Sequence, residues 1–315
     1  MTGAMTDLEL ARELRSRVVG RGREVEVVVA ALSAGRHLLL EGPPGTGKST
    51  LLRALAEASD SGFEFVEGNA ELTPARLVGT FDPAAVLDAG YSPDVFLAGP
   101  LVSAMRDGSL LYLEEINRIP EETLNVLVTV MSEGELHVPR LGAVHAAEGF
   151  HLVAAMNPFD AVGTARISSA VYDRCCRLAM GYQPSDDEAL IVGRASGDTA
   201  PALSPGFILS AVSMVRATRD HADIRTGSSV RGAIDFTLLA TRLAALRDLP
   251  VTDPGVTLDA AQLALSGRFR VREGCGRSAE DLVAELWARW FAPGDPEGDG
   301  TPSGASPEAD SDPKA

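Results

Sequence analysis

The chain has 315 residues with 28 Lys and Arg against 44 Asp and Glu, which gives a formal net charge of −16. Its length allows a large core in one or two domains, and its 45% of hydrophobic residues excludes a wholly disordered protein. The negative charge disfavours nucleic acid as the main partner, because phosphate binding depends on Lys and Arg. No apolar run reaches the roughly 18 residues of a membrane span. The start, MTGAMTDLELARELRSR, lacks the apolar core of a signal peptide, so we expect a cytoplasmic protein.

Helix and strand patterns alternate along the first half of the chain. Residues 7–17 and 23–32 have the spacing of helices. The apolar run HLLLE (37–41) has the length of a strand, and a Gly- and Pro-rich turn and then a helical stretch follow it. Short apolar strands between helices indicate a parallel sheet covered on both faces. The further predicted elements are strands at 63–67, 109–114, 150–156 and 174–182 and a helix at 121–134.

Two Gly- and Pro-rich segments, 79–100 and 134–149, interrupt this alternation and are predicted to be inserted hairpins or loops. After Pro184 the pattern becomes entirely helical, which predicts a second, smaller domain. The residues after 292 are acidic and rich in Pro, Gly and Ser, which is typical of a disordered tail. The predicted units are an N-terminal helix (1–17), an α/β domain (18–183), a helical domain (184–292) and the tail (293–315). The predicted helices of the second domain are 185–195, 206–220, 229–248, 257–266 and 278–291.

Cysteine and histidine give no sign of a metal site. The three Cys are an odd number, two of them are adjacent, and none has CxxC spacing. The five His lack HExxH or paired spacing. We interpret the cysteines as reduced thiols that pack as small hydrophobic residues.

The strongest motif is GPPGTGKS (42–49), which matches G-x-x-x-x-G-K-[ST] between a predicted strand and a predicted helix. Its glycines allow backbone N–H groups to surround phosphate oxygens, and the following helix presents its positive end. Lys48 would reach the β- and γ-phosphates, and Ser49 would bind Mg²⁺. Every other base in the chain is Arg except Lys314, and Arg does not replace Lys where a compact ammonium is needed; the alternative is a chance occurrence of Lys at this position. The sequence therefore predicts a phosphate-binding loop.

A second acidic motif lies about sixty residues downstream, where the apolar run LLYL ends in Glu114 and Glu115. In enzymes with such a phosphate loop, one carboxylate at the end of a strand holds Mg²⁺ and another polarises the attacking water. This assigns Glu114 to the metal and Glu115 to the role of base. The alternative is an ordinary solvated strand end.

With these motifs the chain resembles the AAA+ ATPases, and among them the MoxR family. The residues that carry the resemblance are HLLLEGPPGTGKST (37–50), AGPLVSAMRDGSLLYLEEINRIPEETLNVLVTVMSEG (98–134), VAAMNP (153–158), AVYDR (170–174) and GSSVRG (227–232). The resemblance implies an AAA+ P-loop α/β core with a parallel sheet, followed by a smaller all-helical lid. It also implies that 79–100 is the helix-2 insert and 134–149 the pre-sensor-1 hairpin.

The resemblance adds site residues. Asn157 looks like sensor 1, which holds the nucleophilic water. Arg174 looks like the arginine finger, which acts on the nucleotide of a neighbouring subunit, with Arg166 and Arg177 as rivals. Arg231 looks like sensor 2. The residues implied to contact ATP are Val18, Val19, Gly42, Pro43, Pro44, Gly45, Thr46, Gly47, Lys48, Ser49 and Thr50.

One position departs from the family pattern. The first acid after the strand is usually Asp, and this chain has Glu114. The extra methylene moves the carboxylate by about 1 Å, and Mg²⁺ requires near-ideal octahedral geometry. Slow turnover is therefore one expectation.

Three readings of function follow. The leading one is a Mg²⁺-dependent ATPase that works as a ring, a hexamer by resemblance, and acts as a chaperone-like factor that remodels or matures a protein partner. The resemblance implies a partner with a von Willebrand factor A domain. The alternatives are a nucleotide-gated assembly module with little turnover, which Glu114 keeps open, and a magnesium-chelatase-like subunit.

Overall fold

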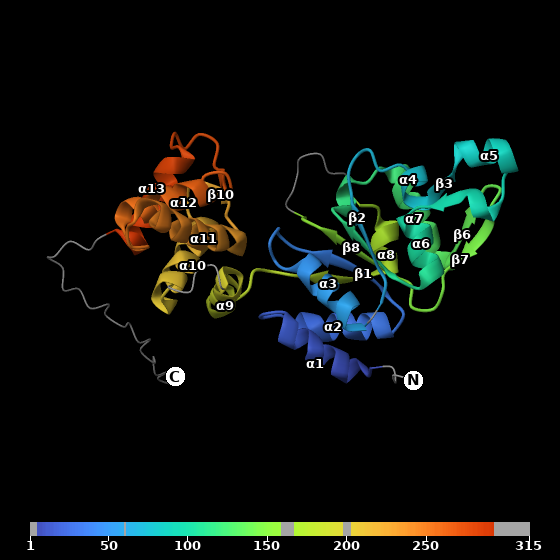
Figure 1. Cartoon of the computed structure of the whole chain (residues 1–315), viewed down its shortest axis with the longest axis horizontal. Coiled ribbons are helices and arrows are strands. Elements are labelled where there is room, and N and C mark those ends of the chain that lie inside the picture. Colours follow the sequence, from blue (N-terminus) through green and yellow to red (C-terminus); the bar gives the residue numbers. More distant parts are fainter. Residues whose placement is uncertain (1–4, 60, 159–166, 198–202, 293–315) are drawn as a thin grey trace, which may run out of the picture.

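The computed structural model describes residues 5–59, 61–158, 167–197 and 203–292. They form an α/β part that is followed in the chain by a helical part (Figure 1). The predicted fold class is therefore confirmed. Arg166 and the predicted tail at 293–315 lie outside the described residues.

A five-stranded sheet forms the centre of the α/β part, in the strand order β2-β5-β8-β1-β9. All neighbouring strands in it are parallel. Their carboxyl ends therefore lie at one edge, where side chains that follow different strands meet. The strands are β1 (His37–Glu41), β2 (Phe63–Glu67), β5 (Leu110–Glu114), β8 (His151–Met156) and β9 (Cys175–Ala179).

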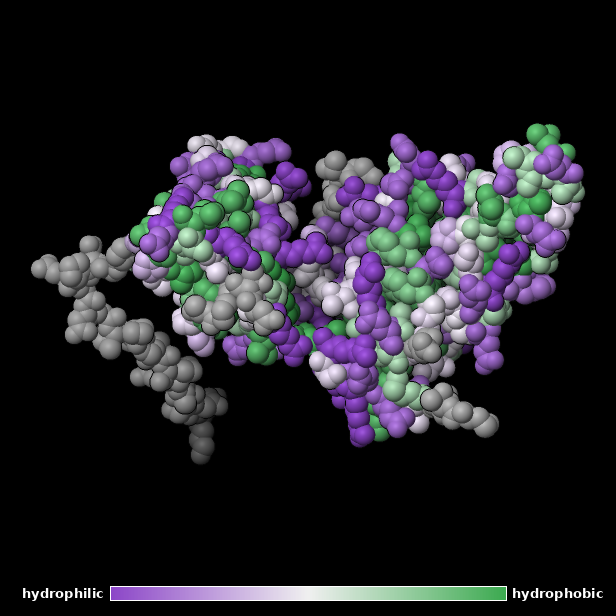
Figure 2. All heavy atoms as spheres, viewed as in Figure 1, coloured by the Kyte–Doolittle hydropathy of each residue, from purple (hydrophilic) through white to green (hydrophobic). Residues whose placement is uncertain are grey.

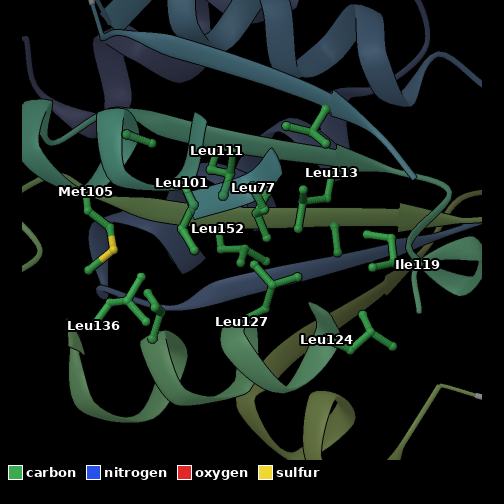
Figure 3. Close-up of a cluster of buried hydrophobic side chains, with 14 of the residues drawn as sticks. Leu77, Leu101, Met105, Leu111, Leu113, Ile119, Leu124, Leu127, Leu136 and Leu152 are labelled. Carbon is green, nitrogen blue, oxygen red and sulfur yellow. The ribbon is translucent and has the colours of Figure 1, made fainter. Parts of the chain in front are cut away.

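Alternate residues of the strands face opposite sides of the sheet, as the period of a strand requires. Leu38 and Leu40 of β1 pack in one hydrophobic cluster with helices α1, α2 and α3 (Asp7–Arg17, Gly22–Ser33 and Lys48–Ser59). Leu39 faces the opposite cluster, which includes helices α6 and α7 (Pro100–Asp107 and Glu121–Glu133). Figure 3 shows side chains of this second cluster filling the space between the sheet and neighbouring helices. Both faces are thus covered, as predicted for short apolar strands.

The two inserted segments are folded. Residues 79–100 contain β3 (Gly79–Phe81) and β4 (Phe96–Ala98), which pair antiparallel, with helix α5 (Pro83–Ala89) and a 3₁₀ turn (Pro93–Val95) between them. Residues 134–149 contain the antiparallel pair β6 (Glu135–Val138) and β7 (Gly142–His145). Helix α5 buries none of its residues and carries Leu87, which is 88% exposed. Figure 2 shows hydrophobic residues at the tip of the molecule over α5.

Three helical elements of three to six residues, outside the inserted segments, were not predicted. Helix α4 (Pro74–Val78) follows β2, and the 3₁₀ turn η2 (Ile116–Arg118) follows β5. Helix α8 (Ser169–Arg174) precedes β9. They were missed because elements of three to six residues are too short to show a helical period.

The helical part has its own hydrophobic cluster, which runs from Val192 to Leu286. Its last helix begins with a capping box, in which Ser278 and Asp281 each accept a backbone N–H of the other. The prediction that this part is entirely helical is wrong in one detail, because β10 (Ile224–Thr226) pairs antiparallel with β11 (Arg270–Val271). The helices are α9 (Ser185–Ser196), α10 (Pro205–Asp220), α11 (Val230–Arg247), α12 (Pro254–Leu265) and α13 (Ala279–Phe291). Among the described residues, no helix has both the length and the apolar character needed to cross a membrane.

Candidate nucleotide-binding site

The phosphate-binding motif lies at the carboxyl edge of the sheet, between β1 and the start of α3 at Lys48. Gly45 and Gly47 have φ angles of 75° and 85°, in the left-handed region that favours glycine. Gly42 is needed for another reason, because a Cβ at this position would lie 2.1 Å from the carbonyl oxygen of Met180. The conformation of this loop therefore depends on the glycines that the motif specifies.

Lys48 is folded back onto this loop. Its Nζ donates hydrogen bonds to the carbonyl oxygens of Gly42 at 2.8 Å and Pro43 at 3.0 Å. Burial lowers the pKa of Lys48, and the nearby Glu114 carboxylate partly opposes this effect. The ammonium is thus a buried cation at the loop, in a position to bind an anion that enters it.

The metal residues predicted on two different elements are in direct contact. Ser49 Oγ, in the first turn of α3, donates a hydrogen bond of 3.1 Å to Oε1 of Glu114 at the end of β5. The hydroxyl of Tyr112 lies 3.2 Å from the same Ser49 Oγ. Burial raises the pKa of Tyr112, so its phenol keeps its proton and can donate to Glu114 or Ser49. A hydroxyl and a carboxylate side by side are the oxygen ligands that Mg²⁺ prefers.

Glu115 follows the strand in an unusual backbone conformation, with φ 54° and ψ 47°. A residue other than glycine in this region costs about 1 kcal/mol. The turn separates the two carboxylates, so that Glu114 faces Ser49 while Glu115 forms an ion pair with Arg118 in the following 3₁₀ turn. The two acids therefore have different neighbours, as different roles would require.

Asn157 follows β8, which lies in the sheet between β1 and β5. The strand that carries Asn157 is thus adjacent to both the strand of the phosphate loop and the strand of Glu114. The N–H of Gly42 donates a hydrogen bond of 3.1 Å to the carbonyl of Met156, the residue before Asn157. The side chain is only partly buried. Asn157 therefore lies at the correct edge of the sheet for the predicted sensor.

Arg21, which the sequence analysis did not single out, supports the phosphate loop from behind. It is 5% exposed, and its Nη2 donates to the carbonyl oxygens of Thr46 and Gly181, both at 2.7 Å. In a trans peptide the carbonyl of Thr46 and the N–H of Gly47 point in opposite directions. By holding the carbonyl outside, Arg21 turns the Gly47 N–H towards the inside of the loop. Its one sequence signal is its position directly before Gly22, the first residue of α2.

A cavity of about 410 Å³ lies beside the loop. Val18, Val19, Gly47 and Thr50 line it from the α/β part. The helical part contributes apolar and cationic side chains. Those that also line the cavity are Ile191, Arg194, Val230, Arg231 and Ile234.

Arg231 of α11 approaches the loop, because its Cγ would lie 3.9 Å from a Cβ built on Gly45. The structure thus brings Arg231 to the same cavity as Val18 and Val19, which are distant from it in the sequence. Apolar walls with several cations suit a flat base that carries phosphates.

The arginine finger candidates have different surroundings. Arg174, at the end of α8, donates to the carbonyl of Ala170 at 3.0 Å and contacts Ser132 of α7. It does not line the cavity described above. Arg177 instead pairs with the buried Glu41, at 2.6 Å from Nε and 2.5 Å from Nη2. This contact gives Arg177 a structural role within its own chain.

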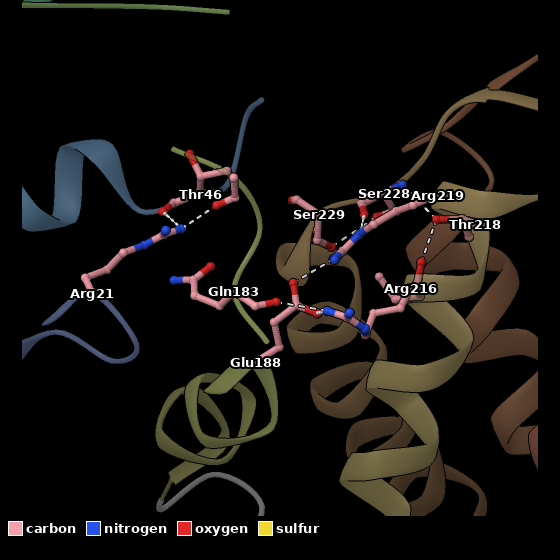
Figure 4. A network of polar contacts seen from close by, with 11 residues as sticks. Arg21, Thr46, Gln183, Glu188, Arg216, Thr218, Arg219, Ser228 and Ser229 are labelled. Carbon is pink, nitrogen blue, oxygen red and sulfur yellow. Dashed lines mark hydrogen bonds and ion pairs between the residues drawn. The ribbon is translucent and has the colours of Figure 1, made fainter. Parts of the chain in front are cut away.

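The segment that connects the two parts is held by arginines from both sides (Figure 4). On the lid side, Arg216 donates to the backbone carbonyl of Gln183 at 2.9 Å. Arg216 and Arg219 both pair with the buried Glu188, at 3.0 and 2.8 Å. Arg21 binds the neighbouring Gly181 carbonyl from the other side. Contacts from the helical part and from the residue behind the phosphate loop therefore meet on this one segment.

Taken together, the donor groups fit ATP and Mg²⁺. The loop offers inward N–H groups and Lys48 for phosphates, and Ser49 with Glu114 offers oxygens for the metal. The cavity extends from the loop towards apolar residues of both parts. These features define a nucleoside triphosphate site of the P-loop class, and residues of the helical part line one side of its cavity.

Comparison with known proteins gives the family. The family model described as the AAA domain (dynein-related subfamily) matches residues 37–175. The uncharacterised protein YeaC of Bacillus subtilis is 30% identical over 300 residues, which cover 86% of this chain and 90% of YeaC. The uncharacterised protein SH1500 of Staphylococcus haemolyticus is 30% identical over 227 residues, or 67% of this chain and 86% of that protein. The chain belongs to the AAA+ ATPases, in the family of this AAA domain.

Solved structures agree on the fold. The crystal structure of an ATPase candidate from Cytophaga hutchinsonii has a TM-score of 0.51 and 21% identity, and covers 90% of this chain and 93% of that chain. The Holliday junction branch migration motor RuvB of Thermotoga maritima has a TM-score of 0.53 and 18% identity, and covers 79% of this chain and 72% of RuvB. The resemblance to AAA+ ATPases is thus confirmed, and the MoxR subgroup stays a prediction.

Proposed function

We propose that the chain is a Mg²⁺-dependent ATP hydrolase whose cycle remodels a protein partner. The observation that carries the proposal is the contact of 3.1 Å between Ser49 and Glu114, which joins the phosphate loop to the strand of the acidic pair. A phosphate loop alone would serve many nucleotide-binding functions. A hydroxyl and a carboxylate adjacent to it provide the metal ligands that phosphoryl transfer needs.

Each residue has a part in the proposed reaction. The N–H groups of the loop and Lys48 hold the phosphates, while Ser49 and Glu114 hold Mg²⁺, which neutralises charge on the transferred group. Glu115 accepts a proton from the attacking water, and Asn157 orients that water.

The rest of the nucleotide is bound by residues on either side of the cavity. Arg231 contacts the phosphates from the lid, and Val18 and Val19 pack against the base.

The proposal includes a ring of identical subunits. Arg174 is the arginine finger in this ring. Two observations support this choice: Arg174 lies outside the cavity of its own chain, and its rival Arg177 already forms an ion pair with Glu41. An arginine that acts on a neighbour neutralises charge in the transition state only when subunits assemble. The hexameric size rests on the resemblance to the MoxR family.

The partner is a protein rather than nucleic acid. The net charge of −16 supports this, since a chain this acidic repels phosphate backbones. The MoxR resemblance supports a chaperone-like role in the cytoplasm and a partner with a von Willebrand factor A domain. The likeness to RuvB concerns the fold.

A second candidate is a nucleotide-gated assembly module with little turnover. It is favoured by the presence of Glu at position 114 where the family usually has Asp, because the longer side chain leaves less room for a hydrated Mg²⁺ than a shorter one. In this case ATP binding would change assembly without rapid hydrolysis. A magnesium-chelatase-like subunit would share the site and differ in its partner.

Steady-state phosphate release tests the proposal, with and without Mg²⁺ and with and without a purified von Willebrand factor A domain protein. We expect Mg²⁺-dependent turnover that the partner changes. ATP binding and assembly with a turnover below about one per hour would instead support the assembly module. An absence of ATP binding would overturn both candidates.

A further inference from the structure

Two buried side-chain atoms among the described residues have no hydrogen-bond partner, and both belong to the wall of the same cavity. They are Nε of Arg21 and Oε1 of Gln183. A buried polar group without a partner destabilises the protein, so such groups are uncommon and call for an explanation. Here both occur next to the phosphate loop.

The backbone of Gln183 is anchored at this wall. Its backbone carbonyl accepts from Arg216, and Pro184 follows as the N-cap of α9. Its side chain is 5% exposed and extends away from the lid towards Arg21 and Thr46 (Figure 4). The Nε2 atom would lie 3.8 Å from a Cβ built on Gly47. The amide therefore lies between the phosphate loop and the apolar part of the cavity.

The rest of the cavity indicates what kind of group the amide faces. Val18 and Val19 come from one side and Ile191, Val230 and Ile234 from the other. Two apolar walls suit a flat aromatic ring. Because the phosphates of a bound nucleotide occupy the loop, its base extends along these walls past Gln183.

A primary amide matches one base in particular. The carbonyl of Gln can accept from the N6 amine of adenine while its NH₂ group donates to N7. Guanine and hypoxanthine present two acceptors at these positions, O6 and N7, so the amide carbonyl would face an oxygen. The terminal torsion of Gln is soft, which allows the amide to turn into this orientation.

We propose that Gln183 is a specificity-determining residue that selects adenine by a two-point hydrogen bond to N6 and N7. This inference rests on the proposed function, because it assumes that a nucleotide occupies the loop. It assigns a role to a residue of the connecting segment, where the motifs of the sequence give no signal. It also explains why Oε1 of Gln183 is left without a partner in the protein.

Diphosphates test the assignment, because they bind without being hydrolysed. Calorimetry would compare ADP, IDP, which has oxygen in place of the N6 amine, and 7-deaza-ADP, which lacks N7. The wild-type protein should bind ADP at least about tenfold more tightly than IDP and about fivefold more tightly than 7-deaza-ADP. In Gln183→Leu both ratios should fall to about two or less, through weaker binding of ADP.

Two further variants keep the test decisive. Gln183→Glu retains the acceptor and a polar side chain, so it should keep a preference for ADP over IDP and lose the difference between ADP and 7-deaza-ADP. Gln262→Leu makes the same change on α12, outside this cavity, and should preserve both ratios.

The possible failures are distinguishable. If Gln183→Leu still binds ADP and the ratio of ADP affinity to IDP affinity is unchanged, the assignment of Gln183 alone is overturned. An equal loss of affinity for both ligands leaves this ratio unchanged and has the same meaning. If Gln183→Leu unfolds, loss of the preference for ADP over IDP in the folded Gln183→Glu protein overturns it as well. No binding of any diphosphate by the wild-type protein overturns the nucleotide site and this inference with it.

Discussion

The hydroxyl of Ser49 donates directly to the carboxylate of Glu114, although 65 residues separate them in the chain. The contact exists because β5 lies two strands away from β1 in a parallel sheet, and the carboxyl ends of both strands open on one edge. It also shows how the longer acid is used. Glu114 spans the distance to Ser49, where a shorter carboxylate would leave space.

Replacement of Glu114 by Asp should increase Mg²⁺ affinity, turnover or both by about threefold. The shorter side chain withdraws from Ser49 by about 1 Å, which leaves room for the metal and its waters in octahedral geometry. The measurement is ATP turnover as a function of Mg²⁺ concentration. A decrease in both quantities would show that the site is adapted to Glu, and an unchanged profile would separate Glu114 from the metal.

Replacement of Lys48 by Ala should weaken ADP binding by at least about 100-fold. The buried ammonium is the cation that the loop itself provides, and its carbonyl contacts keep it at the position where phosphates enter. Calorimetry measures this change, and Lys48→Arg, which preserves the charge, tests whether a compact ammonium is needed. An affinity within about twofold of the wild type would contradict the assignment of the loop.

Replacement of Glu115 by Gln should preserve ATP binding and slow hydrolysis by about 10²–10⁴-fold, because an amide cannot accept the proton of the attacking water. Single-turnover kinetics separate the two effects. Glu121→Gln, on the exposed first turn of α7, is the matched control and should turn over like the wild type. A loss of less than twofold in Glu115→Gln would require another base.

Arg174 and Arg177 should respond differently to replacement by Ala. Arg174→Ala should keep ATP binding and lose about 10³–10⁵ in rate, as finger residues do. Arg177→Ala should instead lower the free energy of unfolding, because it removes the charged partner of the buried Glu41. Chemical denaturation and phosphate release measure the two effects.

Mixed assemblies show whether Arg174 acts on a neighbour. Subunits with Arg174→Ala and subunits with Glu115→Gln should each have little activity alone. When they are mixed, some interfaces combine an intact Glu115 with an intact Arg174, so activity should partly return. If exchange of subunits is verified and activity stays at the level of the single variants, Arg174 acts within its own chain or has no role, and Arg166 becomes the next candidate.

His37 should make the fold less stable as the pH falls from about 6.5 to 4. Burial lowers the pKa of His37 to about 4 from its usual 6.5, and its Nδ1 accepts the N–H of Leu152 at 3.0 Å. Between these pH values the unfolded chain binds a proton that the folded chain does not. The stability that neutral His37 contributes is therefore complete above pH 6.5 and decreases as the pH falls towards 4. The loss should be on the order of 2 kcal/mol.

Urea denaturation at several pH values measures this dependence. His37→Gln cannot be protonated and should show a smaller decrease over this range than the wild type. His137→Gln, exposed on β6, should retain the wild-type slope. Equal slopes in all three proteins would assign the pH dependence to other groups.

The local features of this protein follow from its sequence alone. The strands β1 and β2 have the predicted bounds, since five-residue apolar runs next to helices leave few alternatives. The phosphate loop is equally local, because its glycine conformations and its helix start lie within eight residues. The capping box at Ser278 is local as well, because Ser278 and Asp281 are three residues apart. In such cases the interacting groups are close in the chain, so their pattern can be read directly.

Only the tertiary structure decided which distant residues share the site. The sequence offered no reason to connect Arg21 with Thr46 or Gln183 with Gly47, because these contacts depend on how a helix start and a connecting segment pack behind the loop. The pairing of Arg177 with Glu41 likewise required β1 and β9 to be neighbours in the sheet. Strand order is set by long-range packing of the whole core, and it cannot be inferred from the identity of a single residue.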